Sequence, residues 1–203
     1  MLKERILQQA TDLFSLHGIK NVSMDDLASS LGISKRTIYK NFKNKEDILK
    51  NCILVSWENR GQRITEIMRQ SENVIDGCLQ IIDDYKCTRL PIAIFWEDIY
   101  KYYPEIYRCI LEDAEKSNIY LKRLLKEGIK DNYFRENLHV DETFFMLDMS
   151  TCIIISNIYS VRISFPRTNL IFNIMVNMLR GISTDRGIEI IDKYIDNLSH
   201  SNN

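Results

Sequence analysis

The stretch that decides the fold is residues 27–42, LASSLGISKRTIYKNF. Its apolar residues have helical spacing on both sides of Gly32-Ile33-Ser34, which predicts two short helices joined by a tight turn. Gly32 permits the positive φ that the turn needs, and the small Ala28 lets the two helices approach closely. Ile33 and Ile38 fill the gap between the helices. Together these features are typical of a helix-turn-helix.

The second short helix is expected to run from Lys35 to Phe42 with Ser34 as its N-cap, and its exposed face gathers cations and hydroxyls. Its residues are Lys35, Arg36, Thr37, Tyr39 and Lys40. Cations contact phosphates and guanine edges in a DNA major groove, and hydroxyls contact phosphates or thymine. The turn residues alone are also compatible with an ordinary three-helix bundle whose exposed face contacts only solvent. The concentration of Lys and Arg on one short helix favours the DNA-binding interpretation.

Helices are also predicted on both sides of this pair. An apolar face at helical spacing predicts a helix over 2–17, ended by Gly18. Ser23, with Asp26 three residues later, resembles a capping box and opens the next helix. A fourth helix begins at Asn44 or Lys45 and continues to about residue 69, and its N-terminus can hold a phosphate.

Charge is distributed unevenly along the chain. Residues 1–63 hold eleven Lys and Arg against seven Asp and Glu, whereas the remainder holds sixteen against twenty-one. A basic head on an acidic body indicates that the head binds an anion such as DNA.

The rest of the chain also has helical periodicity, and we find no alternating strand pattern. The sequence therefore predicts an all-α fold with a helix-turn-helix domain over 1–50, a fourth helix to about 69 as connector, and a helical regulatory and dimerisation domain over 51–203. Pro91, Pro104 and Pro166 suit first turns of helices. Further helices are expected near 73–88, 91–103, 105–130, 141–163, 166–180 and 185–198.

Residues 3–50 resemble the DNA-binding domain of the TetR family of transcriptional regulators. The combination Ser-x-x-Thr-Ile-Tyr-x-x-Phe-x-x-Lys-Glu-x-x-Leu, which begins at Ser34 and ends at Leu49, carries the resemblance. The match departs at Asn41, where many relatives carry His. It covers about a quarter of the chain.

The resemblance implies a homodimer that binds double-stranded DNA at a near-palindromic operator, with its two recognition helices about one helical turn apart. By the family pattern Thr37, Tyr39 and Lys45 contact the DNA backbone, and Lys35, Arg36 and Lys40 are the candidates for base contact. Ser23, Ser34 and Asn41 complete the set of expected DNA-binding residues. The family default is repression, relieved by a small-molecule effector bound in the body.

Two clusters in the body suggest where dimerisation and effector binding occur. Residues 144–163 are apolar nearly all round, and the family's last long helices pack against a second copy. The alternative is that these apolar residues are buried within one subunit, which is compatible with a dimer formed by the same helices. We expect the dimer interface to include Phe145, Met149, Ile153, Phe172, Met175 and Leu179.

The second cluster is aromatic and has two interpretations, an effector pocket or ordinary core packing. An aromatic pocket with carboxylates beside it also suits a cation. Its members are Phe95, Trp96, Tyr100, Tyr102, Tyr103 and Tyr107, with Glu97 and Asp98 among them. The residues expected to line a pocket are Phe95, Trp96, Tyr100, Tyr103 and Tyr107.

The sequence has no motif typical of a metal-binding protein, an enzyme, or a secreted or membrane protein. The five cysteines are dispersed without a C-x-x-C pair, so we expect neither a zinc site nor disulfides, and no metal or cofactor. No catalytic motif is present, so a helical enzyme is disfavoured and we predict no catalytic residue. No signal-peptide pattern or membrane span is recognised, so a cytoplasmic location is expected. A regulator controlled by a protein partner stays an alternative to a ligand sensor.

Overall fold

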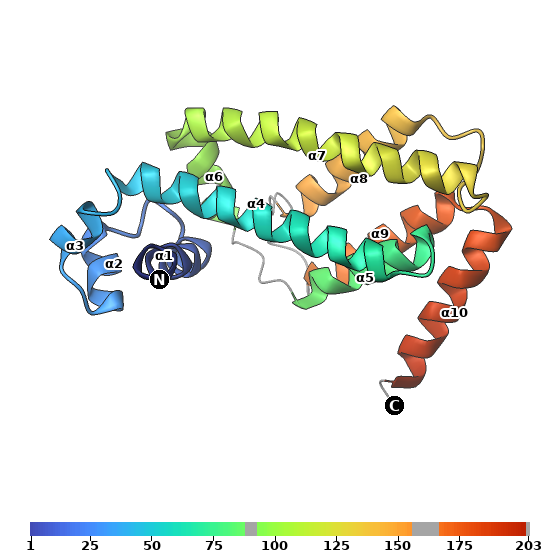
Figure 1. Cartoon of the computed structure of the whole chain (residues 1–203), viewed down its shortest axis with the longest axis horizontal. Helices are drawn as coiled ribbons and strands as arrows, with labels where there is room; N and C mark the ends of the chain where they lie inside the picture. The colour runs from blue at the N-terminus through green and yellow to red at the C-terminus, as the bar shows by residue number, and fades with distance from the viewer. Residues whose placement is uncertain (88–92, 156–166, 202–203) are drawn as a thin grey trace. The chain divides into compact units, whose positions relative to one another are not determined.

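The computed structural model describes residues 1–87, 93–155 and 167–201, and these residues form helices and no strand. The predicted all-α fold is therefore confirmed. Figure 1 shows the order of the helices along the chain. Their bounds are α1 Leu2–His17, α2 Met24–Leu31, α3 Lys35–Tyr39, α4 Lys45–Gln70, α5 Val74–Cys87, α6 Ala93–Tyr102, α7 Pro104–Lys130, α8 Val140–Ile155, α9 Arg167–Ile182 and α10 Asp185–Ser201.

The chain divides into two compact units. Of the described residues, unit 1 contains Met1–Gln62, 93–112 and Ile155, and unit 2 contains 63–87, 113–154 and 167–201. Unit 1 thus includes α6 and the first residues of α7 as well as the segment expected to bind DNA. The domain boundary that the sequence placed at residue 50 stays a prediction.

Unit 1 is built around one apolar core. Because the apolar residues of α1 recur at helical spacing, Ile6, Ala10 and Phe14 are all buried there. Each large aliphatic or aromatic side chain buried in this way stabilises the fold by roughly 1.5–3 kcal/mol. The other buried members come from α2 to α4, the intervening turns, α6 and α7: Ile19, Val22, Leu27, Ala28, Ile38, Phe42, Ile48, Leu49, Cys52, Phe95, Ile99 and Ile106.

Unit 2 has a separate core in which α5, α9 and α10 pack against one another (Figure 1). Gly128 on α7 lies against the Phe134 ring, where an added Cβ would come within 2.3 Å of the ring carbons. Glycine is therefore required there by close packing. The buried members of this core are Ile75, Leu79, Ile82, Leu125, Phe134, Phe144, Val176, Leu179, Ile182 and Ile191.

Several predicted helix bounds agree with the structure and others differ. The first helix ends at Gly18 and α7 begins at Pro104, close to the sequence-based bounds. The recognition helix was expected to run to Phe42, but regular α3 ends at Tyr39. The chain then leaves the helix through tighter turns, in which the N–H groups of Asn41 and Phe42 both bond the Ile38 carbonyl. Pro91, Pro166 and the expected end of the 141–163 helix lie outside the described residues.

Within residues 1–87, 93–155 and 167–201, no helix has both the length and the apolar character that a membrane span requires.

Candidate nucleic-acid interface

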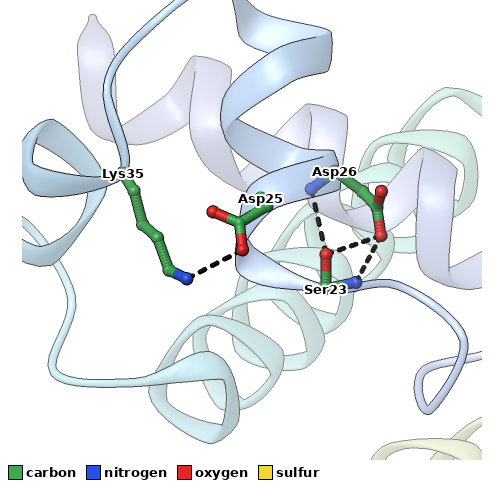
Figure 2. Close-up of polar contacts among 4 residues, drawn as sticks. All are labelled: Ser23, Asp25, Asp26 and Lys35. Carbon is green, nitrogen blue, oxygen red and sulfur yellow. Dashed lines mark hydrogen bonds and ion pairs between the residues drawn. The ribbon is translucent and has the colours of Figure 1, made fainter.

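The helix pair α2–α3 is held by side-chain caps at both of its N-termini. The Ser23 hydroxyl accepts a hydrogen bond from the Asp26 N–H at 3.1 Å, and the Asp26 carboxylate accepts one from the Ser23 N–H at 2.8 Å (Figure 2). This reciprocal pair is the capping box that the sequence predicted. Hydrogen bonds from the Ser23 hydroxyl and N–H lower the pKa of Asp26.

The turn between the helices also follows the sequence-based expectation. Gly32 has φ +65°, in the left-handed region that favours glycine, and its N–H bonds back to the end of α2. Ser34 then caps α3 by accepting a hydrogen bond from the Thr37 N–H at 3.1 Å. A connection of only three residues between two capped helices fixes their relative orientation.

Burial of Ile38 determines which face of α3 is exposed. Ile38 is 0 % exposed in the core of unit 1, so the residues around it on the helix surface point away from that core. Thr37 is half-buried. The exposed residues of α3 and its C-terminal turn are Lys35, Arg36, Tyr39 and Lys40, which are four of the expected DNA-binding residues.

Lys35 already has a partner on the neighbouring helix. Its ammonium Nζ lies 2.8 Å from the Asp25 carboxylate of α2 (Figure 2). The hydrogen bond with Asp25 raises the pKa of Lys35. Both side chains are well exposed, so the pair contributes little to stability and exchanges readily with other partners. The sequence alone does not predict this pair, although a spacing of ten residues across the helix-turn-helix is compatible with one.

Asn41, where the sequence departs from the family pattern, has a structural contact. Its side-chain amide donates a hydrogen bond to the Thr37 carbonyl at 2.8 Å and so satisfies one of the free carbonyls at the end of α3. Ser34 and Thr37 share a hydroxyl–hydroxyl hydrogen bond of 2.8 Å on the other end of the helix. Both contacts stiffen a helix of only one and a half turns.

At the N-terminus of α4, side chains of the protein itself accept hydrogen bonds from backbone N–H groups. The Asn44 side chain accepts a hydrogen bond from the Asp47 N–H at 2.8 Å, and the Asp47 carboxylate accepts one from the Lys43 N–H at 2.9 Å. Sequence reasoning placed the helix start at Asn44 or Lys45 and missed these caps, although Asn and Asp three residues apart are a sufficient signal.

Lys45, the expected backbone contact on α4, is half-buried. Its ammonium lies 5.9 Å from the centroid of the Phe14 ring. Burial lowers the pKa of Lys45, and the negative charges of Asp98 and Asp26 oppose that effect. The ammonium therefore lies near the ring of a core residue, Phe14, and interacts favourably with two carboxylates.

The aromatic residues expected to form a pocket fall into two groups. Phe95 is buried and Trp96 and Tyr103 are half-buried, all in contact with the core of unit 1. Tyr100 and Tyr107 form an exposed edge-to-face pair with ring centroids 5.3 Å apart. A hollow of about 240 Å³ lies elsewhere, in unit 2, and is lined by Arg135, Asn137, Leu138, His139, Glu142, Thr143 and Met146.

The residues expected at the dimer interface are also distributed unevenly. Phe145 is 63 % exposed, next to the exposed Met146. Phe172 and Met175 are half-buried and pack against the core of unit 2, whereas Leu179 is buried within it. The side chains of Met149 and Ile153 lie outside the described residues.

Comparison with known proteins places this geometry in a family. Residues 6–52 match the family model of bacterial regulatory proteins, tetR family. The chain is 31 % identical over 133 residues to an HTH-type transcriptional regulator, YhgD, of Bacillus subtilis, an alignment that spans 63 % of this chain and 69 % of the relative. The chain belongs to the TetR family of transcriptional regulators. TetR-family membership makes it a DNA-binding transcriptional regulator.

Other proteins are similar to this chain in part of the sequence or in the fold. The match to an HTH-type transcriptional regulator of Staphylococcus aureus is 35 % identical but spans only 37 % of that protein. Two solved structures, each about 18–19 % identical, share the fold. They are a regulator from Saccharomonospora viridis in complex with choline (TM-score 0.76, 90 % of this chain and 98 % of that one) and FadR from Bacillus subtilis in complex with stearoyl-CoA (TM-score 0.66, 88 % and 98 %).

Proposed function

We propose that this regulator is a homodimeric repressor that binds a near-palindromic operator through α2 and α3 and is released by a small-molecule effector. The exposed basic face of α3 is the observation that carries the proposal. With Ile38 buried beneath it, the helix presents Arg36, Tyr39 and Lys40 outward, and these side chains suit phosphates and base edges in a major groove. The protein acts in the cytoplasm, where its DNA is accessible.

Dimerisation follows from how a short recognition helix binds DNA. One helix of five regular residues reaches only a few base pairs, so two copies one helical turn apart are needed for a specific site. The exposed apolar side chains of Phe145 and Met146 on α8 are suited to cover by a second copy.

Control by a small molecule is supported by structural neighbours, two of which are bound to choline and stearoyl-CoA. For this chain we propose an effector pocket near Phe95, Trp96, Tyr100, Tyr103 and Tyr107. The Trp96 indole N–H is buried and has no hydrogen-bond partner within the described residues, so it is a donor available to a ligand.

The deciding experiment is selection of bound duplexes from random DNA by the full chain. We expect a near-palindrome with half-sites about one helical turn apart, bound with an affinity that falls steeply with salt. Enrichment of no sequence, or of a single asymmetric half-site bound by a monomer, contradicts the proposal. Thermal-shift screening of small molecules, followed by release of the selected operator, then tests effector control. Release only by a protein from the same cell contradicts the small-molecule effector.

A further inference from the structure

Asp98 on α6 is a buried carboxylate far along the chain from the helix-turn-helix. It is 4 % exposed and is the one acidic side chain among the described residues that is buried to this degree. Its Oδ2 accepts a hydrogen bond of 2.7 Å from the backbone N–H of Lys20, which lies in the loop between α1 and α2. Both residues belong to unit 1.

Burying a carboxylate is unfavourable unless its charge is compensated by hydrogen bonds or cations. The Lys20 N–H supplies one charge-assisted hydrogen bond, which is stronger than a bond between neutral groups. The positive charge of Lys45 interacts favourably with the same carboxylate. An apolar residue would fill this position on α6 without such a cost, so the carboxylate indicates a specific role for the bond to the loop.

Gly18 shows independently that the loop is pressed against α6. Gly18 has φ +81°, and a Cβ added there would lie 2.7 Å from Ile94 Cγ2 and 3.2 Å from Asp98 Oδ2. Only a residue without a side chain permits this approach. Ile94 and Asp98, two different residues of α6, therefore both lie against the short loop between α1 and α2.

The loop leads directly into the helix-turn-helix. Ile19 and Val22 are buried in the core of unit 1, and the next residue is Ser23, the N-cap of α2. A backbone bond at Lys20 thus fixes the chain three residues before the N-cap of α2, the first helix of the DNA-binding pair.

We propose that Asp98 is a positioning residue for DNA binding, which holds the 18–22 loop on α6 and thereby sets the position of α2 and α3. This inference rests on the proposed operator binding. Operator affinity then depends on a side chain that does not touch DNA.

The test compares three variants on the selected operator, by fluorescence anisotropy. Asp98→Leu removes the acceptor, and we expect operator affinity to fall about tenfold, the effect of losing one hydrogen bond to a charged group. Asp98→Asn keeps an oxygen that accepts from Lys20, and we expect it to restore most of that loss. The matched control is Tyr102→Phe, which deletes the exposed 3.1 Å contact of the Lys20 ammonium with the Tyr102 hydroxyl and should leave affinity unchanged.

Hydrogen–deuterium exchange separates positioning from general destabilisation. We expect the Lys20 amide of the wild-type chain to be protected, and Asp98→Leu to speed exchange over residues 18–22 while α1 stays as protected as before. Protection of the Lys20 amide can be measured in the wild-type chain even if Asp98→Leu does not fold. An unprotected Lys20 amide in the wild-type chain overturns the inference.

Three further results separate this inference from the function on which it rests. Wild-type affinity in Asp98→Leu, or equal losses in the Leu and Asn variants, overturns the role of Asp98 and leaves operator binding intact. Failure of the wild-type chain to bind any selected duplex overturns the proposed function itself.

Discussion

Asp25 on α2 and Lys35 on α3 form an ion pair of 2.8 Å across the turn of the helix-turn-helix. Lys35 is an expected base contact, so DNA competes with Asp25 for its ammonium. Removing the carboxylate frees this cation and deletes a negative charge beside the DNA surface. We expect Asp25→Asn to tighten binding to any duplex several-fold, and more at low salt, because exposed charges are screened by ions.

The control for this prediction is Glu105→Gln, which makes the same charge change on α7 at an exposed residue paired with Arg108. It should leave DNA affinity close to that of the wild-type chain. Titrations of operator and random duplexes at several salt concentrations measure both variants. Unchanged or weaker binding by Asp25→Asn would show that Lys35 does not face DNA.

Arg36 and Tyr39 are both exposed, yet we expect their substitution to have different effects. Arg36→Ala should reduce discrimination between the operator and altered sites by about 1–3 kcal/mol, the value of one bidentate base contact. Tyr39→Ala and Lys45→Ala should weaken all sequences equally, since backbone contacts carry no sequence information.

Lys50→Ala, at an exposed position of α4 outside the expected set, is the control for this comparison. Binding of the four variants to a panel of singly substituted operators distinguishes the two classes of effect. A uniform loss for Arg36→Ala would remove Arg36 from the base contacts.

The local structure of residues 23–49 was predictable because it depends on short-range chemistry. The caps at Ser23 and Ser34 and the left-handed Gly32 follow from residue type and spacing, and the structure has all three. The end of α3 was predicted three residues too late, because Phe42 has the correct helical spacing and is buried even though the helix has ended. The spacing of apolar residues alone does not distinguish a last turn of α-helix from a tighter turn that follows the helix.

Long-range contacts were not predictable in the same way. The sequence identifies Asp98 only as an acid among aromatic residues, and nothing in its local sequence indicates a bond to Lys20, 78 positions away. The aromatic residues of α6 also divide between the core of unit 1 and its surface, which one helix's periodicity does not reveal. Such placements depend on packing between helices, for which one sequence holds no direct signal.

The Ser23 cap should make a measurable contribution to stability. Ser23→Ala removes the acceptor of the Asp26 N–H, and we expect the free energy of unfolding to fall by about 1 kcal/mol. Ser29→Ala changes an exposed serine inside α2 that is not the N-cap of the helix, so this substitution should not destabilise the chain. Urea titrations followed by circular dichroism measure both, and equal stabilities for the two variants would mean that the cap contributes nothing.

The same capping box predicts a dependence on acid. Hydrogen bonds from Ser23 lower the pKa of Asp26, so the folded state favours the charged carboxylate. This contribution is present above the ordinary pKa of 3.8 and is lost as the pH falls through the lower folded value. Asp26→Asn should therefore flatten the acid side of the stability curve, and an unchanged acid slope would argue against the capping box in solution.

Cys52 predicts a dependence on alkali. Burial in the core of unit 1 raises the pKa of its thiol from 9.0 to about 11. Above pH 9 the unfolded chain ionises this thiol while the folded chain keeps it neutral, so stability falls as pH rises from about 9 to 11. The loss attributable to Cys52 is about 3 kcal/mol, at about 1.4 kcal/mol for each pKa unit. Cys52→Ala should show a shallower decline over this range than the wild-type chain in parallel urea titrations, and parallel curves would contradict burial of the thiol.

Phe145 provides the test of dimerisation. Its side chain is 63 % exposed on α8 and takes no part in the buried core of unit 2, so substitution should leave the subunit folded. Phe145→Asp places a charge where the proposed partner subunit packs, and we expect the dissociation constant of the dimer to rise tenfold or more. Tyr107→Asp, at another exposed aromatic residue, on α7, should leave it unchanged. Sedimentation velocity over a concentration series measures both variants. If Phe145→Asp stays dimeric at the concentrations where the wild-type chain does, the interface lies on another face of the protein.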